Sequence, residues 1–428
     1  MQSWGLLEAQ PSRLLSARNR GEASEQWRGS LGMPRVIHGA GRSYSDVALP
    51  AAGSAAVLAG NLRHVLGFDR AAGIMEVEAG VTLRAIQELA LSAGWGLPVI
   101  PGTAWASAGG ALANDVHGKN HGLRGSFSRC VRSVRMLRQD RGEFRLDRSD
   151  AALWAATVGG LGATGVILSL EVELEPWAGP WVNYSQTRFE GIAEFMELSD
   201  EGSEYCVGWL DAMRSVPRGI LFRGQRLSRC GDAPLRRGRE RPIPAIPLRV
   251  ITPGASKLFN LAYWAAHSNK LGLSASWEKF FCPLDAIGGW NRLYGPEGFV
   301  QLQCALPKEA AAAGLREICG ACQKAGQGSF LSVVKKMGEI PSEGILSFAR
   351  PGVTFAMDFP RGPQTDALMA RLRDISLGCG GSIYPAKTRI ESMREFELSF
   401  PSWRDWRSQW DGQGAGGSMW IERIFNGR

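Results

Sequence analysis

The sequence predicts an α+β protein in two parts, on the evidence of its length and of two successive patterns. A chain of 428 residues is longer than one ordinary core supports, so two domains, or one large α/β domain with a second lobe, are expected. Up to Pro176, short apolar strands alternate with helical segments, as in an α/β domain. From about Trp181, strands and helices with many aromatic residues follow. Pro176 is therefore the first predicted domain boundary.

Composition indicates a globular enzyme with an anionic ligand. The chain is 44% hydrophobic and 21% charged, with a formal net charge of +8. That charge favours a phosphate, a nucleic acid or a lipid head group without choosing among them. The 54 glycines indicate backbone brought close to a bound group. The eight cysteines are scattered through a long chain, which predicts reduced thiols, an intracellular protein and no structural disulfide.

The sequence predicts neither export nor a membrane span. The N-terminal residues lack the basic start, apolar stretch and cleavage site of a signal peptide. Two uncharged stretches, residues 89–114 and 151–170, are interrupted by prolines or glycines. Both are interpreted as buried segments rich in loops.

The first elements surround a glycine loop. Val36 and Ile37 form a short strand that leads into His38-Gly-Ala-Gly-Arg-Ser-Tyr-Ser-Asp46, the first candidate phosphate cradle. Residues 74–79 alternate as a strand. Thr82 is a predicted N-cap for the next helix, which Gly94 ends.

A second loop is the densest stretch of the chain. Residues 102–121 gather glycines with Asn114, Asp115, His117 and His121, as expected around a ligand. After it, residues 131–137 and 143–146 are predicted to form a hairpin, and residues 165–175 a long strand closed by Pro176.

In the second half of the chain, residues 280–306 and 348–360 are predicted to be strands, with an alanine-rich helix at 308–324 between them. Residues 226–249 hold seven arginines and several prolines, and we interpret them as a mobile basic loop because they cannot build a core. This loop lacks the interleaved aromatic residues of a nucleic-acid surface. Solvation, or contact with an anionic membrane surface, is the better interpretation.

Two motifs have more than one interpretation. Gly160-Leu-Gly-Ala-Thr-Gly165 matches the dinucleotide fingerprint, but a strand rather than a helix follows, which argues against a nicotinamide site. His117 and His121 have the spacing of zinc ligands on a helix, yet a histidine beside a glycine loop is better placed to contact a ligand or move a proton, or is simply bonded to backbone. No metal is predicted.

Two further motifs are weaker. Cys319 and Cys322 form a lone CxxC on a predicted helix, which favours two half-buried thiols over redox or metal chemistry. Lys387 follows the Gly380-Gly381 turn in a predicted short strand, where a lysine is out of place unless it is paired. A plain surface lysine is the alternative.

Several segments together resemble one known family. Four segments are similar to segments of decaprenylphosphoryl-β-D-ribose 2′-oxidases, within the vanillyl-alcohol-oxidase superfamily: His38-Gly-Ala-Gly-Arg-Ser-Tyr44, Asp115-Val-His-Gly-Lys-Asn-His121, Trp154-Ala-Ala-Thr-Val-Gly-Gly160, and Pro283-Leu-Asp285 together with Trp290-Asn-Arg-Leu-Tyr-Gly295. The resemblance implies a two-lobed, PCMH-type FAD-binding domain of two α/β subdomains. It would be made from residues 1–178 with a C-terminal return at 383–428. A substrate-binding domain at 179–382, with an antiparallel sheet flanked by helices, would carry the mobile loop.

The resemblance also implies which residues contact the flavin. These are Ile37, His38, Gly39, Ala40, Gly41, Arg42, Ser43, Tyr44, Ser45, Asp46, Val47, Gly102, Ser107, Ala108, Gly109, Gly110, Asn114, Asp115, Val116, His117, Gly165, Val166, Ile167 and Tyr384. Backbone N–H groups exposed by glycines bind a pyrophosphate without a Rossmann helix. Relatives with covalent flavin carry a histidine in the first loop where this chain has Arg42, so noncovalent FAD is expected.

The implied reaction is hydride transfer from a secondary alcohol carbon to flavin N5, as in the 2′-epimerisation of decaprenylphosphoryl-ribose. Lys387 and His117 would be catalytic, and Lys387 would serve as base because neighbouring cations lower a lysine pKa. The implied substrate-binding residues are Lys119, Tyr294, Gln301, Gln303, Lys335 and Lys387.

The chain also departs from the family pattern, at Ser45, Asn114, Gly122 and the C-terminal residues 420–425. These departures leave open another polyprenyl-linked pentose, or a soluble substrate of the alditol or aldonolactone oxidase type. A noncatalytic polyanion-binding protein is the alternative from another class. A short-chain reductase partner and a cytoplasmic location, peripheral at the inner membrane face, are further expectations, with no nucleic-acid partner.

Overall fold

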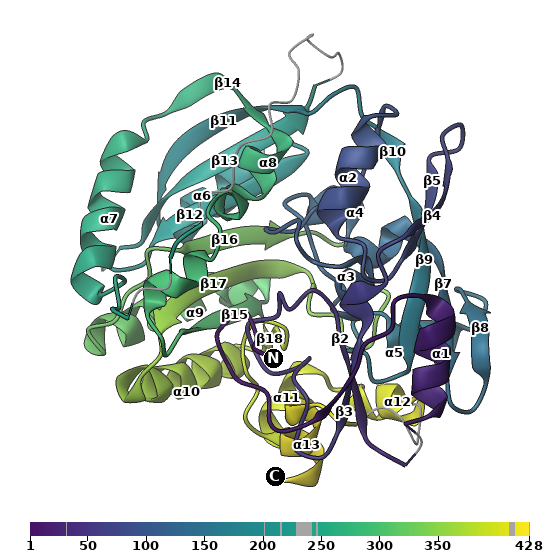
Figure 1. Cartoon of the computed structure of the whole chain (residues 1–428). Coiled ribbons are helices and arrows are strands. Elements are labelled where there is room, and N and C mark those ends of the chain that lie inside the picture. Colours follow the sequence, from purple (N-terminus) through teal and green to yellow (C-terminus); the bar gives the residue numbers. More distant parts are fainter. Residues whose placement is uncertain are drawn as a thin grey trace.

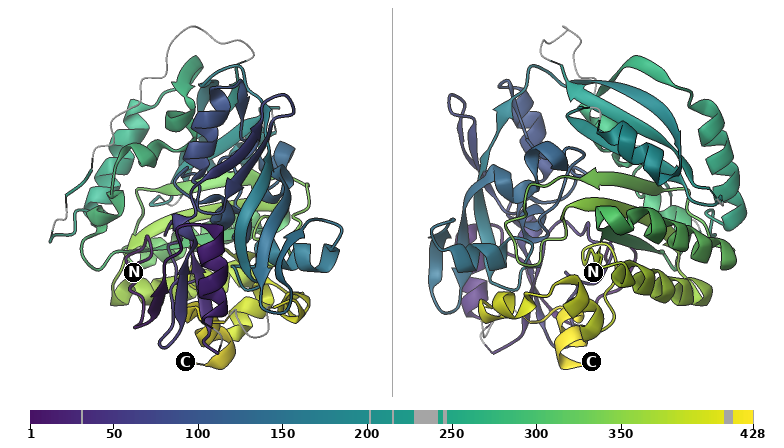
Figure 2. Two further views of the ribbon diagram at one scale, coloured as in Figure 1. Left: turned by 45° about the vertical axis from the view of Figure 1, so that its right-hand side comes forward. Right: turned by 180° about the vertical axis from the view of Figure 1, so that it is seen from behind.

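A computed structural model of the chain has two lobes that face each other (Figures 1 and 2). It describes residues 1–427 apart from 31, 201, 215, 228–241, 245–246 and 411–415. One lobe contains the N-terminal elements, purple to blue in Figure 1, and the other contains the teal and green elements of the middle of the chain. The helices of the C-terminal segment, in yellow, lie below both.

The N-terminal lobe has two subdomains, each with its own sheet. A small parallel sheet has the order β1-β3-β2 and carries helix α1 (Arg20–Arg28). Its strands are β1 (Arg13–Leu15), β2 (Arg35–His38) and β3 (Ala55–Leu58). An antiparallel sheet of order β4-β5-β9-β7-β8 forms the second subdomain. Its strands are β4 (Val65–Asp69), β5 (Ile74–Glu78), β7 (Val131–Arg138), β8 (Gly142–Leu146) and β9 (Val166–Glu173).

Local sequence signals explain the helices of this lobe. Thr82 caps α2 (Leu83–Leu91) by accepting a hydrogen bond from the Ala85 N–H, as its sequence position predicted. Ser107 caps α3 (Ala108–Ala113) and Asp150 caps α5 (Ala151–Thr157) in the same way. The predicted hairpin of β7 and β8 is confirmed. β9 follows the Gly160–165 motif directly, so no helix N-terminus faces that motif from the C-terminal side.

The second lobe is built on one long antiparallel sheet of order β14-β11-β13-β12-β16-β17-β15-β18. Helices α6 (Gly191–Ser199), α9 (Lys308–Lys324) and α10 (Pro363–Gly378) pack against one face. The strands are β11 (Trp181–Glu190), β12 (Tyr205–Asp211), β13 (Arg218–Arg226), β14 (Lys270–Ser276), β15 (Phe299–Leu306), β16 (Ser332–Met337), β17 (Gly352–Pro360) and β18 (Ser382–Ile383). The predicted alanine-rich helix at 308–324 is confirmed as α9.

Two strand predictions were too long. Only Phe299–Leu306 is extended within residues 280–306, because the preceding stretch folds into α8 (Trp277–Phe281) and two 3-10 turns, η3 (Pro283–Ala286) and η4 (Trp290–Tyr294). Gly289 and Gly295, both at positive φ, bound the second turn. The strand predicted from residue 348 begins only at Gly352, after Pro351.

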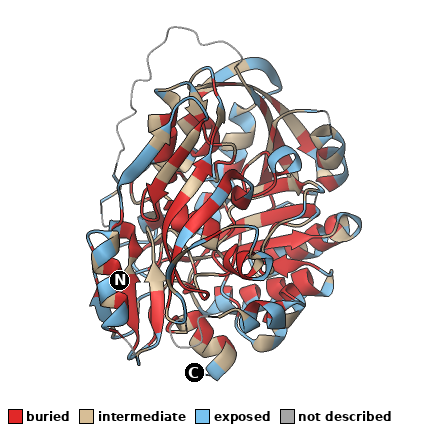
Figure 3. Cartoon of the chain, turned by 90° about the vertical axis from the view of Figure 1, so that its right-hand side faces the viewer, coloured by how far each residue is buried: buried red, intermediate tan, exposed pale blue. Residues whose placement is uncertain are grey.

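The C-terminal segment packs against both lobes. Helices α11 (Met393–Ser399), α12 (Trp403–Ser408) and α13 (Met419–Asn426) share one apolar cluster with α9 and α10 of the second lobe. The backbone of Met419 donates to the Leu49 carbonyl, and Arg423 forms an ion pair with Asp46. The chain end thus contacts the loop that follows β2. In Figure 3 the buried residues, in red, extend through the middle of the molecule.

Three remaining predictions concern the arginine-rich segment, the cysteines and the absence of a membrane-spanning helix. Most of the arginine-rich segment lies outside the described residues, although Arg226 ends β13 and pairs with Glu175 and Glu204. Cys319 and Cys322 are fully buried rather than half-buried, and seven cysteines are free in the described part of the chain. Among the described residues, no helix has the length and apolar character that crossing a membrane requires.

Candidate active site

A cavity of about 820 Å3 lies between the two lobes. The glycine loops of the N-terminal lobe form one wall, and residues of the long sheet, with Tyr263 and Phe281 beside them, form the other. Most predicted site residues line it: Ile37, Gly39, Ala40, Gly41, Arg42, Ser43, Tyr44, Val47, Gly102, Ser107, Gly109, Gly110, Asn114, Val116, His117, Lys119, Gly165, Ile167, Gln301, Gln303, Lys335, Tyr384 and Lys387.

The two glycine loops approach each other at Gly39 and Ser107. A Cβ atom on Gly39 would lie 2.6 Å from Ser107 Oγ, and one on Gly60 would lie 2.7 Å from the Gly39 carbonyl oxygen. Ser107 is held in place because its hydroxyl also caps α3 through the Gly110 N–H. Only glycine permits this approach, so the spacing of the loops depends on residue 39.

The Gly160–165 motif has a divided role. Gly162 and Gly165, both at positive φ, line the cavity, and Leu161 beside them adopts φ +57°. Gly160 instead packs on protein, because a Cβ there would lie 1.9 Å from the Ala156 carbonyl oxygen. Part of the motif thus brings backbone to the cavity, and part closes the turn after α5.

His117 lies in the cavity wall as a buried, neutral imidazole. Burial first, and then the charges of Lys335, His121 and Lys387, hold its pKa well below the ordinary histidine value. Its Nε2 lies 3.5 Å from Gln303 Nε2, and its ring stacks on Phe348 at 5.6 Å between centroids. His117 belongs to a bridge with Ser126, whereas His121 begins α4 (His121–Arg124), so the two do not share a helix face. The described residues contain no cluster of potential metal ligands.

Two lysines occupy the side of the cavity near His117. Lys335 on β16 is 7% exposed and donates to the Gly118 carbonyl at 2.7 Å. Burial, with the charge of Lys119, lowers the pKa of Lys335 to about 7. Lys119 donates to the Phe280 carbonyl and lies 4.8 Å from the centroid of the Phe280 ring, and burial lowers its pKa to about 8.

Lys387 approaches from the C-terminal segment. It lies in a turn and not in the predicted strand, because β18 ends at Ile383 and Pro385 has no N–H for a ladder. Its backbone N–H donates to the Tyr384 carbonyl, and its Nζ lies 3.4 Å from the centroid of the Tyr44 ring. Burial lowers the pKa of Lys387 to about 7, although Asp358 and Asp285 act in the opposite direction.

Seven predicted residues do not line the cavity: His38, Ser45, Asp46, Ala108, Asp115, Val166 and Tyr294. Most support the loops from behind. His38 Nδ1 bonds the Ala48 carbonyl oxygen, Ser45 donates to the Pro385 carbonyl, and Asp46 pairs with Arg423. Tyr294 is fully buried and stacks on Phe299 at 4.7 Å between centroids, so in this structure its ring is part of an aromatic cluster.

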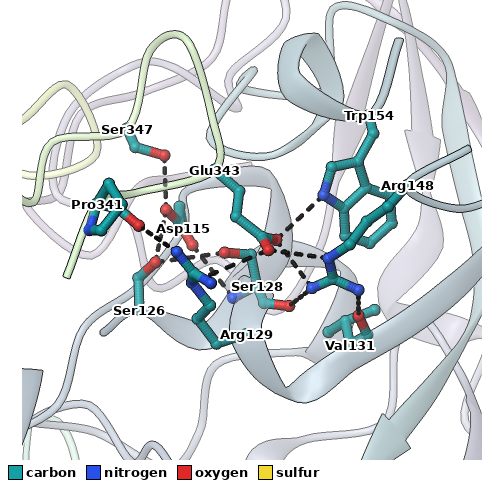
Figure 4. Close-up of polar contacts among 10 residues, drawn as sticks. All are labelled: Asp115, Ser126, Ser128, Arg129, Val131, Arg148, Trp154, Pro341, Glu343 and Ser347. Carbon is teal, nitrogen blue, oxygen red and sulfur yellow. Dashed lines mark hydrogen bonds and ion pairs between the residues drawn. The ribbon is translucent and has the colours of Figure 1, made fainter. Parts of the chain in front are cut away.

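Asp115 fastens the second loop to a segment of the other lobe (Figure 4). Its carboxylate accepts hydrogen bonds from the hydroxyls of Ser126 at 2.8 Å and Ser347 at 2.5 Å. Nearby, Glu343 accepts from Arg148 at 2.9 Å and from the Trp154 indole at 3.1 Å. The segment 341–349 also carries Phe348, which stacks on Tyr384. The lobes are therefore joined directly behind His117.

Comparisons with known proteins agree with this geometry. A family model described as an FAD binding domain matches residues 11–146. The chain is 31% identical over 394 residues to decaprenylphosphoryl-β-D-ribose oxidase of Mycolicibacterium smegmatis, which covers 87% of this chain and 84% of that protein. The chain belongs to the decaprenylphosphoryl-β-D-ribose oxidase family. It is also 26% identical over 351 residues to the "Uncharacterized protein in mprA 5'region" of Streptomyces coelicolor, covering 76% of this chain and 94% of that one.

Membership in the decaprenylphosphoryl-β-D-ribose oxidase family makes the chain an FAD-linked oxidase with the predicted α+β fold. The noncatalytic polyanion-binding alternative is therefore wrong. The cavity fits FAD on its own evidence. Its polar wall includes Asn114 Oδ1 and His117 Nδ1, which are buried and have no hydrogen-bond partner among the described residues. Its volume is in the upper part of the range for ligand pockets, roughly 300–1,000 Å3.

Several lining residues carried no signal in the sequence. Trp4 and Trp105 flank the Arg42 guanidinium, whose Cζ lies 4.2 Å and 6.0 Å from their ring centroids. The carboxylate of Asp285 accepts a hydrogen bond from the Ala104 N–H at 2.8 Å. The charge of Arg42 lowers the pKa of Asp285, and Asp285 in turn raises the pKa of Lys387. Trp209, on β12, lines the cavity from the second lobe. Only Asp285 lay in a segment that carried the family resemblance, and single tryptophans have no pattern that predicts a cavity.

Proposed function

We propose that the enzyme oxidises a secondary hydroxyl of a polyprenyl-linked sugar phosphate to a ketone, with Lys387 as the base. The relative from Mycolicibacterium smegmatis is named for a decaprenylphosphoryl-ribose substrate, which supports this substrate class. Bound FAD supplies the hydride acceptor, at N5 of its ring. The residues of the chain bind the sugar, orient it and take up the proton.

The observation that carries the proposal is the placement of Lys387 and His117 in one cavity. A lysine with a pKa of about 7 is unprotonated in a large fraction of molecules near neutral pH, so its amine accepts the hydroxyl proton. His117 is neutral, and its ring is held between Phe348 and Gln303. It therefore donates or accepts a hydrogen bond at the reacting hydroxyl without adding charge.

Lys335 and Lys119 support a phosphate on the substrate. Both ammonium groups are taken out of water and their pKa values are lowered, which is unfavourable without an anion. A phosphate between them would restore the charged forms and gain charge-assisted hydrogen bonds. Neutral sugars gain nothing comparable from these groups.

The surface beside the cavity supports a lipid-linked substrate and peripheral contact with the cytoplasmic membrane face. Helix α7 (Pro253–Ala266) contributes Tyr263 to the cavity and exposes Leu258 to 70%, with Phe259 and Leu261 beside it. Leu248 and Leu271 are exposed to 70% and 81%. Several exposed large apolar side chains on one helix, as on α7, are typical of a binding surface and not of a monomer facing water.

FAD would be bound noncovalently. Arg42 occupies the first loop where relatives with covalent flavin carry histidine. Among the described residues that line the cavity, His117 is the sole histidine and no cysteine is present. The attachment is tested by acid denaturation, which should release all yellow colour from the protein pellet.

A soluble alditol or aldonolactone oxidase is the second candidate. The departures at Asn114 and Gly122 favour it, since they alter the second loop. Epimerisation of the lipid-linked sugar would need a separate reductase that reduces the ketone again. Such a partner therefore belongs only to the proposal for the lipid-linked substrate.

The test compares flavin reduction by substrate in the unaltered enzyme and in Lys387→Ala. The variant should retain FAD yet lose flavin reduction by a factor on the order of 100 to 10,000. Reduction of the flavin at the unaltered rate in Lys387→Ala would refute the role of the lysine. Equal rates with phosphorylated and unphosphorylated sugars would favour the soluble alternative.

A further inference from the structure

A buried carboxyl lies behind the sugar side of the cavity. Asp358 on β17 is fully buried and stands directly opposite Gln301 of β15 in the sheet. The Gln301 side-chain amide donates to Asp358 Oδ1, while Oδ2 has no hydrogen-bond partner among the described residues. The Asp358 backbone N–H donates to Ser329 Oγ at 3.1 Å.

The sheet register puts Asp358 next to the turn that carries Lys387. Gln301 and Gln303 line the cavity, and their cross-strand partners are Asp358 and Ala356. The hydroxyl of Thr388, the residue after Lys387, donates to the Gln301 carbonyl at 2.9 Å. Thr388, the neighbour of Lys387, and Asp358 thus contact the same glutamine.

The other charged or titratable groups around Lys387 come from three further elements. Asp285 lies in η3, Arg42 in the first glycine loop and His117 in the second loop. The Tyr44 ring covers one side of the ammonium group. The charge of Arg42 disfavours the ammonium form of Lys387 and lowers its pKa, whereas the two aspartates favour the ammonium form and raise the pKa. Asp358 is the more deeply buried of the two aspartates, so its charge is the less screened.

We propose that Asp358 is the buried counter-charge of Lys387, a positioning residue that stabilises the ammonium form produced when Lys387 takes the substrate hydroxyl proton. The inference rests on the proposed base role of Lys387. The bond broken is the hydroxyl O–H, and the proton moves to Lys387 Nζ. Hydride from the same carbon goes to the FAD that the established activity supplies. Asp358 exchanges no proton with the substrate, since it does not line the cavity.

The pKa of Lys387 depends on whether Asp358 is ionised or neutral. Burial raises the pKa of Asp358 to about 7, and the charge of Lys387 lowers it. When Asp358 is ionised it favours the ammonium form of Lys387, so its presence raises the pKa of the lysine. Removing that charge must lower the Lys387 pKa.

Asp358→Asn is the informative variant, because asparagine keeps an oxygen for the Gln301 amide and removes only the charge. The measurement is the pH dependence of Lys387 acetylation by acetic anhydride in the FAD-loaded enzyme, followed by mass spectrometry of the Lys387 peptide. The midpoint should lie near 7 in the unaltered enzyme. It should fall by about one pH unit in Asp358→Asn.

Ser329→Ala is the matched control, because it disturbs the backbone contact of Asp358 without changing charge. It should leave the acetylation midpoint where it is. A midpoint in Asp358→Asn equal to that of the unaltered enzyme, with FAD retained, would overturn the inference. An equal shift in Ser329→Ala would also overturn it, since the effect would then be structural.

The acetylation midpoint does not depend on turnover, so the two proposals fail separately. If Lys387→Ala reduces its flavin normally, the base role fails whatever the midpoint does. If Lys387→Ala is inactive and the midpoint does not move in Asp358→Asn, only the counter-charge is wrong. If Asp358→Asn does not fold, Gln301→Leu takes its place. This variant removes the hydrogen bond from Gln301 that stabilises the ionised carboxylate, so it should raise the pKa of Asp358 and lower the acetylation midpoint of Lys387.

Discussion

The Nζ atom of Lys387 lies 3.4 Å from the centroid of the Tyr44 ring. The contact joins the C-terminal segment to the first glycine loop, and the Tyr44 N–H donates to the Ala386 carbonyl at 2.8 Å beside it. A cation over an aromatic ring gains about 0.5–2 kcal/mol, more where water is excluded. The ring therefore orients Lys387 toward the cavity.

Tyr44→Leu removes that ring and should slow flavin reduction by substrate about tenfold, which corresponds to 1.4 kcal/mol. Tyr44→Phe keeps the ring and serves as the control, with a rate close to that of the unaltered enzyme. Stopped-flow absorbance under anaerobic conditions measures both. Equal slowing in the two variants would show that the hydroxyl, and not the ring, matters.

Lys335→Met should stabilise the protein and weaken substrate binding together. Burial lowers the pKa of folded Lys335 to about 7, below the unfolded value, so the cost of burying this lysine is fully present below pH 7 and disappears as pH rises toward the unfolded value. Replacement by methionine should raise the free energy of unfolding at pH 7 by about 1 kcal/mol, and by less at higher pH.

Lys336→Ala is the control for Lys335, since Lys336 is the next residue on β16 and pairs with Asp200 away from the cavity. Denaturant titrations at two pH values and KM for the phosphorylated substrate give the readouts. A Lys335→Met enzyme with unchanged KM would argue against a phosphate at that position.

Gly39→Val should yield protein with little FAD. Its Cβ would collide with Ser107 Oγ, which caps α3, and so would force the two glycine loops apart. Gly254→Ala is the control, because a Cβ at this exposed helical position meets no atom within 4 Å. The ratio of flavin to protein absorbance in purified samples decides the matter, and full FAD content in Gly39→Val would contradict the loop assignment.

Glu343→Ala should loosen the segment behind the active site. It leaves the Trp154 indole N–H without its acceptor and removes the ion pair with Arg148, so the free energy of unfolding should fall by about 1–3 kcal/mol. Glu339→Ala, at an exposed position just before this segment, should change stability little. Because Phe348 of this segment stacks on Tyr384, Glu343→Ala should also release FAD more readily in a dilution assay.

The sequence predicted local features well because each has a local cause. The Thr82 cap, the alanine-rich helix α9 and the β7–β8 hairpin depend on neighbouring residues, and the structure has them where they were expected. The strand predicted after the Gly160–165 motif is also confirmed, as β9. In contrast, residues 280–295 are apolar and aromatic enough to be taken for strand, but Pro283 and Gly289 break them into short turns.

The cavity itself depends on contacts between distant residues, which no local pattern contains. The turn at Lys387 follows from Pro385, but its meeting with Tyr44 follows from the return of the C-terminal segment. Asp358 lay within a strand that the sequence predicted, yet only the register with Gln301 shows where its carboxyl points. Tyr294 was expected at the substrate and lies instead among Trp290, Phe299 and Phe330.

Anaerobic mixing of the purified enzyme with a polyprenyl-phosphoryl pentose in detergent tests the central claim most directly. The account predicts that the oxidised-flavin absorbance bleaches and that a keto sugar phosphate forms in equal amount. An enzyme whose FAD stays oxidised with this substrate, while free alditols or aldonolactones bleach it, would contradict the account.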